Sequence, residues 1–303
     1  MSAILVSGLI NLEVTLRVDG FPVDYTPVRY PFFGVNSAVS GVGYNVAKAL
    51  TALGDAVRLL SIVGRDGAGT LVRESLRCDG IGHDLVVYQA ERTAHSVILY
   101  NRQGQRQINV DLKDLQEQVY PETLLDRAFD GCSTAVLCNV NFSRPLLKAA
   151  REQGKLIATD VHAVSDLDDV YNQDFMRYAD VLFMSDELLP CAAEEWAGAV
   201  LERFGPEVLV IGLGARGVLL GVKSDGFMER VPAVHARPIV STIGAGDALF
   251  SAFIHFYSRS ENAYSAIRRA VVFASYKIGE AGAAEGFLGE EPLHDLCKKL
   301  EVE

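Results

Sequence analysis

The sequence predicts an α/β protein, with a doubly wound, mainly parallel sheet that has helices on both faces and a small additional β-sheet. From residue 128 onward, short apolar runs alternate with segments of helical period, the pattern of βα units. Between the first βα units lie segments with strict polar–apolar alternation, which is typical of half-exposed strands. The 303 residues, 49% of them hydrophobic, suit one large domain over residues 1–303 with an inserted small sheet.

Composition excludes several classes of protein. The formal net charge of −11 argues against non-specific binding to nucleic acid or to anionic membranes. The longest apolar stretches fall well short of the roughly 20 residues of a membrane span. A secretory signal begins with positive charge, whereas no positively charged residue precedes Arg17 here. The five cysteines are odd in number and form no C-x-x-C pair. We therefore expect a soluble cytoplasmic protein with reduced thiols.

In the first half of the chain, residues 3–8 form an apolar run that predicts a buried first strand. A helix is expected over 45–53, ending at Gly54, then a strand over 57–63 and a helix over 71–77. The alternating segments that predict the small sheet are 11–18, 28–33, 84–88, 96–100 and 106–110.

In the second half, the expected strands are 135–138, 156–159, 181–184 and 208–211, and the expected helices are 145–153, 173–178 and 195–204. Residues 218–222 and 226–230 predict a hairpin or edge strands. A further helix is expected over 263–278, followed by a glycine- and alanine-rich loop over 280–289. Ligands of open parallel sheets bind beyond the carboxyl ends of the strands, so polar residues there are site candidates.

The stretch 240–247, Val-Ser-Thr-Ile-Gly-Ala-Gly-Asp, carries the most specific chemistry. A β-like run precedes it and an apolar pattern of helical period follows, so Gly244 to Gly246 should form the turn that opens a helix. The amide groups of such a turn bind anions. The carboxylate of Asp247 would repel a bound phosphate, so its position beside an anion site makes more sense if it takes a proton from an attacking hydroxyl. The alternative is a glycine-rich turn with a capping Asp.

Two motifs together resemble one family. Residues 242–247, T-I-G-A-G-D, resemble the C-terminal signature of the ribokinase-like (PfkB) carbohydrate and nucleoside kinases. Residues 40–54, S-G-V-G-Y-N-V-A-K-A-L-T-A-L-G, resemble the N-terminal signature of the same family. The resemblance implies an ATP- and Mg²⁺-dependent kinase with Asp247 as catalytic base and with Thr242, Gly244, Ala245 and Gly246 as anion hole. It also implies that the small sheet, from about 11–39 and 84–112, is a lid over the substrate and a possible homodimer surface.

The resemblance also assigns a substrate side. Gly41, Gly43 and Asn45 match the sugar-binding signature, although Asn45 could simply cap the helix that follows. Asn11 and Glu13 lie where the family often has N-x-D, so the acid here is one methylene longer. Asn139 falls near another substrate position, or ends its strand in a turn.

The nucleotide side is less complete. Gly212, Gly214 and Gly217 resemble the glycines of the nucleotide pocket, Ala274 falls in the region that flanks adenine, and Ser185 begins the segment that aligns with N-x-x-E. The Asn and Glu of that motif are Ser185 and Leu188 here, so only Glu187 could help to hold Mg²⁺, through water. The Asp that opens the C-terminal signature in many relatives, where it accompanies a monovalent-cation site, is Ser241. A monovalent cation is therefore doubtful.

The leading interpretation is phosphorylation of a hydroxymethyl group on a small sugar-like molecule. A nucleoside kinase is the alternative within enzymes, with Phe32, Phe33, Tyr44 and Tyr100 as candidates for a wall against the base. A non-catalytic sugar or nucleotide sensor is the alternative outside enzymes. A metal site at Asp160 and His162 would lack further matched ligands, and a dinucleotide oxidoreductase would lack the acid that ends its fingerprint.

Overall fold

The computed structural model describes residues 2–302 and contains a nine-stranded sheet in the order β13-β12-β11-β10-β9-β8-β1-β4-β5. Neighbouring strands are parallel from β5 to β11, and β12 and β13 continue the sheet as an antiparallel hairpin at one edge. The central strands are mostly apolar and buried because helices cover both faces. The strands are β1 (Ala3–Ser7), β4 (Val57–Gly64), β5 (Leu85–Ala90), β8 (Cys132–Leu137), β9 (Leu156–Ala163), β10 (Val181–Ser185), β11 (Val208–Gly212), β12 (Val218–Val222) and β13 (Phe227–Val231).

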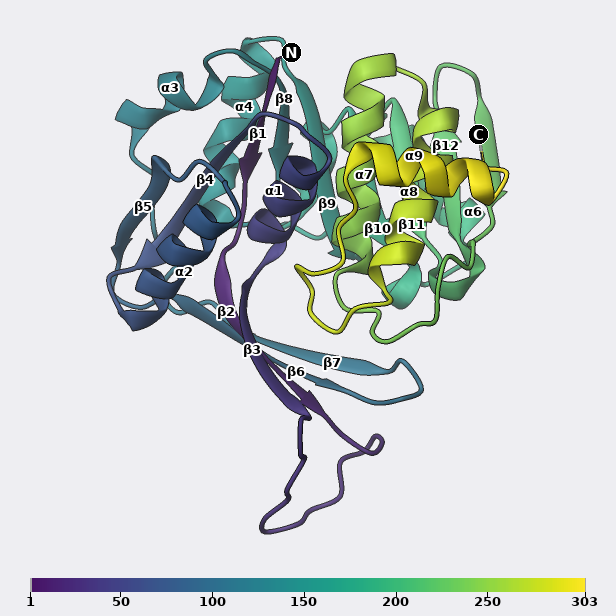
Figure 1. Cartoon of the computed structure of the whole chain (residues 1–303). Helices are drawn as coiled ribbons and strands as arrows, with labels where there is room; N and C mark the ends of the chain where they lie inside the picture. The colour runs from purple at the N-terminus through teal and green to yellow at the C-terminus, as the bar shows by residue number, and fades with distance from the viewer. Residues whose placement is uncertain (1, 303) are drawn as a thin grey trace.

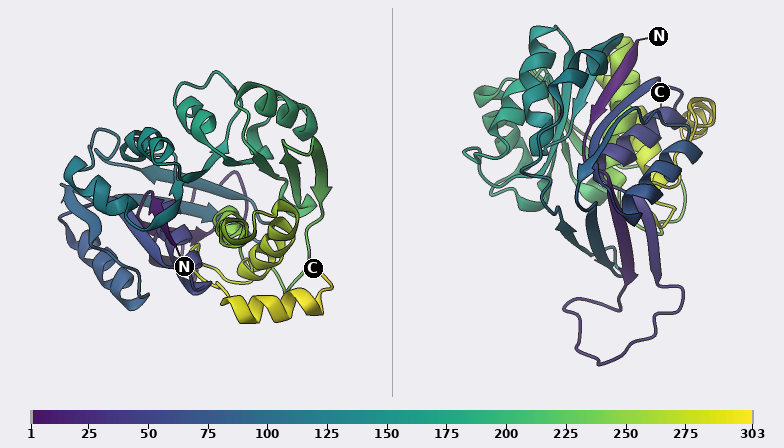
Figure 2. Two further views of the ribbon diagram at one scale, coloured as in Figure 1. Left: turned by 90° about the horizontal axis from the view of Figure 1, so that it is seen from above. Right: turned by 90° about the vertical axis from the view of Figure 1, so that its left-hand side faces the viewer.

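Helices form a layer on each face of this sheet (Figures 1 and 2). One hydrophobic core joins the sheet to α1 (Val42–Ala52), α2 (Gly67–Cys78), α7 (Ala245–Ser260), α8 (Ala263–Lys277) and α9 (Glu290–Lys299). The other core joins it to α3 (Leu125–Phe129), α4 (Arg144–Glu152), α5 (Gln173–Tyr178) and α6 (Ala193–Arg203). Short 3₁₀ turns are η1 (Glu122–Leu124), η2 (Asn141–Ser143), η3 (Asp186–Leu188) and η4 (Gly214–Arg216). The predicted doubly wound, mainly parallel architecture is thus confirmed.

A separate sheet of four strands stands off one end of this body, in the order β3-β2-β6-β7 (Figure 1). Its strands are β2 (Asn11–Arg17), β3 (Val35–Ser40), β6 (Ala94–Tyr100) and β7 (Arg106–Asp111). The segment between β2 and β3 forms a long irregular loop at the far end of the small sheet (Figure 2). Within residues 2–302, no helix has the length and apolarity that crossing a bilayer would require.

Two strand predictions for the small sheet were wrong. Residues 28–33 lie in the irregular loop, since Pro31 has no amide hydrogen to give a strand ladder, and residues 35–40 form the strand instead. The strand expected over 84–88 is β5, which pairs with β4 at the edge of the large sheet. It returns to that sheet after α2, as a right-handed crossover does. The small sheet itself consists of residues 11–17, 35–40, 94–100 and 106–111.

The remaining boundaries differ by a few residues. Helix α1 begins before the expected residue 45 because Gly41 already serves as its N-terminal cap. The helix α9 was not predicted at all, although it has Glu290 and Glu291 in its first turn and Lys298 and Lys299 in its last. That distribution of charge stabilises a helix through its dipole and was a readable signal. The β-like run before Ser241 is irregular rather than a strand, held by the amides of Val240 and Ser241, which donate to the Ile278 carbonyl at 2.9 and 3.1 Å.

Candidate active site

The turn before α7 has the conformation that its glycines predict. Gly244 is the N-terminal cap of α7, in the left-handed region with φ 74°, and a Cβ there would lie 2.5 Å from the Ala283 carbonyl oxygen. The Ala245 amide donates to the Thr242 carbonyl at 3.2 Å, which closes the turn. The next amides, of Gly246 and Asp247, belong to the first turn of a 16-residue helix, where no intrahelical acceptor exists. The turn can therefore bind an anion.

Asp247 lies in the first turn of α7 and joins a chain of polar side chains from three other elements. Asn45 of α1 donates from Nδ2 to Asp247 Oδ2 at 2.6 Å. The Ser40 hydroxyl at the end of β3 lies 3.2 Å from Asn45 Oδ1 and 3.0 Å from Glu13 Oε2 on β2. The chain thus links the catalytic candidate Asp247 to the substrate candidate Glu13 through Asn45 and Ser40.

Burial shapes the charges in this cluster. Desolvation raises the pKa of Asp247 above its usual range, partly offset by the hydrogen bond from Asn45 and by the nearby charges of His162 and Lys277. Desolvation also raises the pKa of Glu13, offset by its hydrogen bond with Ser40. Lys277, at the end of α8, faces both carboxylates, and burial lowers its pKa from 10.5 to about 8. A carboxylate with a raised pKa is a better general base near neutral pH.

The remaining substrate candidates occupy different positions. Asn11 begins β2, beside Ser40, and its buried Oδ1 atom has no recorded hydrogen-bond partner within residues 2–302. Gly41 and Gly43 do allow a close approach, but to protein backbone, since a Cβ would lie 2.5 Å from Leu9 O and from Gly8 C, respectively. The Nδ2 of Asn139 donates to a residue outside the polar chain, Asn172, whose Oδ1 lies 3.0 Å away.

The nucleotide candidates follow neighbouring strands of the large sheet. Ser185 ends β10 and pairs in register with Gly212 at the end of β11. Gly214 and Gly217 both have positive φ, 60° and 91°, in the tight turn between β11 and β12. Ala274 lies on α8 and packs against the core. Strand pairing therefore brings Ser185 and Gly212 together, and the turn with Gly214 and Gly217 follows directly after Gly212.

An arginine of the small sheet contacts both the anion-binding turn and the segment with the Mg²⁺ candidate Glu187. Arg106, the first residue of β7, donates to Thr242 Oγ1 at 3.2 Å and to Glu187 Oε1 at 2.9 Å. Sequence reasoning missed Arg106, and also Ser40 and Lys277. A readable signal existed for Lys277 alone: it stands four residues after Phe273 on the apolar face of a predicted helix, where a charge is out of place.

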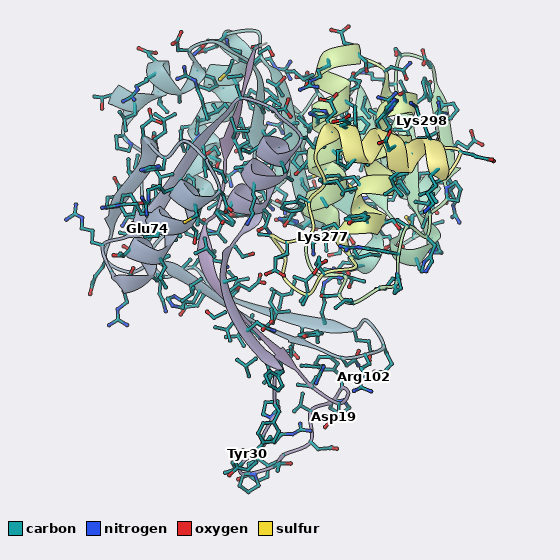
Figure 3. All side chains as sticks on the ribbon, viewed as in Figure 1. Asp19, Tyr30, Glu74, Arg102, Lys277 and Lys298 are labelled. Carbon is teal, nitrogen blue, oxygen red and sulfur yellow. The ribbon has the colours of Figure 1, made fainter. Side chains whose placement is uncertain are left out.

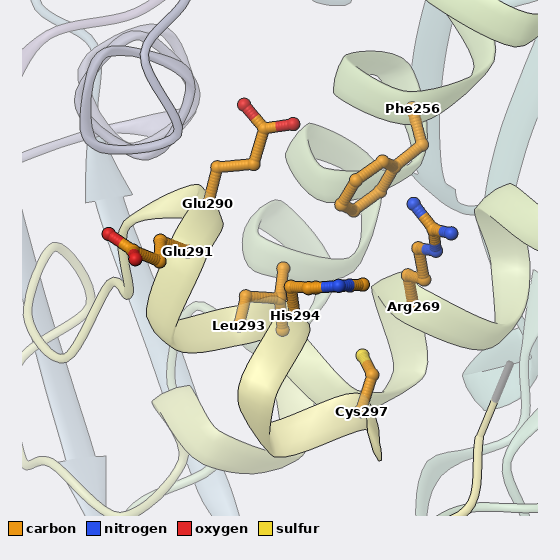
Figure 4. A pocket seen from close by; sticks show the side chains of 7 residues that line it. All are labelled: Phe256, Arg269, Glu290, Glu291, Leu293, His294 and Cys297. Carbon is orange, nitrogen blue, oxygen red and sulfur yellow. The ribbon is translucent and has the colours of Figure 1, made fainter.

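A surface hollow of about 460 Å³ lies elsewhere, between α7, α8 and α9 (Figure 4). Its lining includes Phe256, Glu290 and His294. Phe256 is nine residues beyond Asp247 along α7, which corresponds to roughly 13 Å of helix. The hollow is therefore separate from the site that the motifs and the polar chain define.

Comparison with known proteins identifies the family of the chain. The chain matches the profile described as pfkB family carbohydrate kinase over residues 1–288. It is 26% identical over 287 residues to the ATP-dependent ribose-1-phosphate kinase of Halopiger xanaduensis, covering 93% of this chain and 94% of the relative. It is 28% identical over 255 residues to the 1-phosphofructokinase of Haloferax volcanii, covering 80% of each chain.

Solved structures share the fold. A microbiome-derived acarbose kinase superposes with a TM-score of 0.88 and 25% identity, covering 98% of this chain and 99% of that one. The ribokinase of Thermotoga maritima gives 0.78 at 21% identity, covering 98% and 100%, which shows the fold alone. With nearly the whole chain matched, this protein belongs to the pfkB family and is a carbohydrate kinase.

Proposed function

We propose that this protein transfers the γ-phosphate of ATP to a hydroxymethyl group of a sugar or sugar-like molecule. The observation that carries the proposal is the position of Asp247, which combines a base of raised pKa with the anion-binding turn of α7. Phosphoryl transfer requires a group to accept the hydroxyl proton and donors to stabilise the transferring phosphoryl group. Both requirements meet within one turn of one helix.

The mechanism assigns a separate task to each oxygen of Asp247. Asn45 holds Oδ2 at 2.6 Å, which orients the carboxylate and leaves Oδ1 to accept the substrate proton. The amides of Gly246 and Asp247, together with Thr242, bind the phosphoryl oxygens as charge develops on them. Glu13 and Asn11 line the sugar side, where the unpartnered Asn11 Oδ1 can accept a hydrogen bond from a hydroxyl.

The residues fit ATP with Mg²⁺. Mg²⁺ keeps several waters and binds mainly through substrate phosphates with one or two carboxylates. Glu187, beside Thr242 across the Arg106 side chain, is the carboxylate placed to take part. Mg²⁺, when bound, neutralises charge on the phosphates.

A nucleoside substrate is the second candidate, and the aromatic side chains do not favour it. Tyr44 is buried in the core and its hydroxyl donates to Asp79, so it cannot form a wall against a base. Phe32 and Phe33 are exposed in the loop at the far end of the small sheet. Only Tyr100, opposite Arg106 on β6, remains near the site.

The test is ADP release from Mg-ATP with a panel of pentoses, hexoses, keto-sugars, sugar phosphates, oligosaccharides and nucleosides. Sugar phosphates and oligosaccharides belong in the panel because the relatives' names include ribose-1-phosphate kinase and acarbose kinase. We expect one sugar class to give turnover that Asp247→Asn reduces by about 10²- to 10⁴-fold, with KM little changed. Asp295→Asn, on the exposed face of α9, is the matched control.

Two results would contradict the proposal. Undiminished turnover in Asp247→Asn would remove the base from the mechanism. Absence of turnover across the panel, while sugars still raise the thermal unfolding midpoint, would instead indicate a sensor that binds without catalysis.

A further inference from the structure

Lys277 is the one charged residue among the largest fully buried side chains of residues 2–302, with 0% of its surface exposed. It ends α8, near the junction between the C-terminal half of the chain and the small sheet (Figure 3). Burying an ammonium group costs free energy unless the charge is compensated, and an apolar side chain of similar volume often packs there at no cost in stability. Packing alone therefore does not explain a lysine at this buried position.

The direct partner of Lys277 lies inside the anion-binding turn. Its Nζ donates to the carbonyl oxygen of Ile243, and none of the ion pairs within 4 Å in the described part of the chain involves Lys277. The carboxylates that face Lys277 at longer range are Asp247 and Glu13, with Glu285 and Glu280 of the following loop. The ammonium therefore contacts one carbonyl oxygen directly and faces several carboxylates, which is the environment of a bound cation.

The contact fixes the direction of an anion-hole donor. The Ile243 carbonyl and the Gly244 amide belong to one planar trans peptide and point in opposite directions. When Lys277 holds the carbonyl, the Gly244 N–H must point away from Lys277, and the positive charge polarises that N–H toward an anion. The carboxyl end of α8 favours a cation at this position. The same end also holds Val240 and Ser241 through the Ile278 carbonyl.

We propose that Lys277 is a built-in cation beneath the anion-binding turn, which orients the Ile243–Gly244 peptide and balances Asp247 and Glu13, so that phosphoryl transfer needs no added monovalent cation. Lys277 is a positioning residue, because it reaches the phosphate only through the turn. This inference rests on the proposed phosphotransferase function for its kinetic test, but it also has a test that needs no substrate.

The substrate-free test measures thermal unfolding in KCl, NH₄Cl and choline chloride at equal ionic strength. We expect the midpoint of the wild-type protein to be the same in all three salts. In Lys277→Ala the lost side chain leaves both space and an uncompensated carbonyl, so K⁺ or NH₄⁺ should raise the midpoint relative to choline, as a ligand that binds the folded state does. Lys277→Met fills the space without charge and should not respond. Lys298→Ala, at an exposed lysine of α9, is the control.

The kinetic test measures ADP release with the substrate that the panel identifies. We expect wild-type turnover to be independent of K⁺, and Lys277→Ala to lose roughly 10²-fold in choline and to regain at least tenfold in K⁺ or NH₄⁺. Lys277→Met should lose as much and regain nothing. Stimulation of the wild type by K⁺, full turnover in Lys277→Met, or a Lys277→Ala protein that no cation restores would each overturn the proposal. If the wild type phosphorylates nothing in the panel, the proposed function fails, while the unfolding experiment still decides the role of Lys277.

Discussion

At the scale of single residues, the site depends on how a few polar side chains share their hydrogen bonds. Asp247 and Asn45 are 202 positions apart in the chain, yet Asn45 Nδ2 lies 2.6 Å from Asp247 Oδ2. Since Asn45 Oδ1 faces Ser40, the amide cannot rotate without losing one of these contacts. The carboxylate is thus held in a fixed orientation before any substrate arrives.

Lys277 leads to a prediction about pH. Its pKa is about 8 in the folded protein and 10.5 in an unfolded chain, and the groups that face it are Asp247, Glu13, Glu285 and Glu280. Between pH 8 and pH 10.5 the Lys277 side chain is mostly neutral in the folded protein but protonated in the unfolded chain. The free energy of unfolding should therefore rise with pH by about 3 kcal/mol more in the wild type than in Lys277→Met. Urea denaturation from pH 7.5 to 10.5 measures this difference. An identical pH slope in the two proteins would contradict it, and Lys298→Met should behave as wild type.

At the scale of elements, β7 is the part of the small sheet that reaches across to the phosphate side. Arg106 bonds Thr242, which lies just before α7, and Glu187, in η3. A guanidinium in this position joins three elements from distant parts of the sequence with two hydrogen bonds. The small sheet is therefore held against the anion-binding turn, as a lid over the site would be.

Replacing Arg106 should loosen that connection. In Arg106→Met we expect kcat/KM for ATP to fall roughly tenfold to a hundredfold, because the charge beside Thr242 and the contact between the small sheet and the anion-binding turn are both lost. Steady-state ADP release at varied ATP measures the effect. Arg102→Met, in the turn between β6 and β7 (labelled in Figure 3), changes the charge of the small sheet equally and should retain wild-type kinetics. Equal losses in both variants would show that only net charge matters.

At the scale of the whole molecule, the two faces of the small sheet differ. One face carries Asn11, Glu13 and Ser96, which are buried toward the site. The opposite face carries a strip of half-exposed apolar residues beside polar ones: Val14 pairs with Val97, Leu16 pairs with Val35, and Val97 also pairs with Asn109. Val97 is 44% exposed and Val35 is 54% exposed. We propose that a second copy of the chain covers this face, since a twofold interface requires only one self-complementary patch.

A charge on that face should prevent association. We expect the wild-type protein to have twice its chain mass of 32.9 kDa in size-exclusion chromatography with light scattering, and Val97→Lys to have the mass of one chain. Val170→Lys is the matched control, because Val170 is exposed in the large domain, 85% of its surface. A wild-type protein that stays monomeric at micromolar concentrations would rule out this dimer.

Several features could be predicted from the sequence because they depend on local pattern. Apolar runs of four to six residues predicted the central strands, and Gly244 predicted the turn before α7, since few other residues adopt its positive φ. The pairing of β5 could not be predicted, because an alternating segment fits the edge of either sheet. The roles of Gly41 and Gly43 could not be predicted either, because the groups that approach them closely are the backbone atoms of Leu9 and Gly8.

The sequence by itself determined the βα alternation of the large sheet, the family and the residue that acts as candidate base, because periodicity and two contiguous motifs are properties of the chain alone. The tertiary structure decided which distant side chains meet: Asn45 with Asp247, Arg106 with Thr242 and Glu187, and Lys277 with the Ile243 carbonyl. The physical reason is that burial and long-range contact set the charge and direction of a polar group. These depend on packing between segments up to 202 residues apart, which no local pattern encodes.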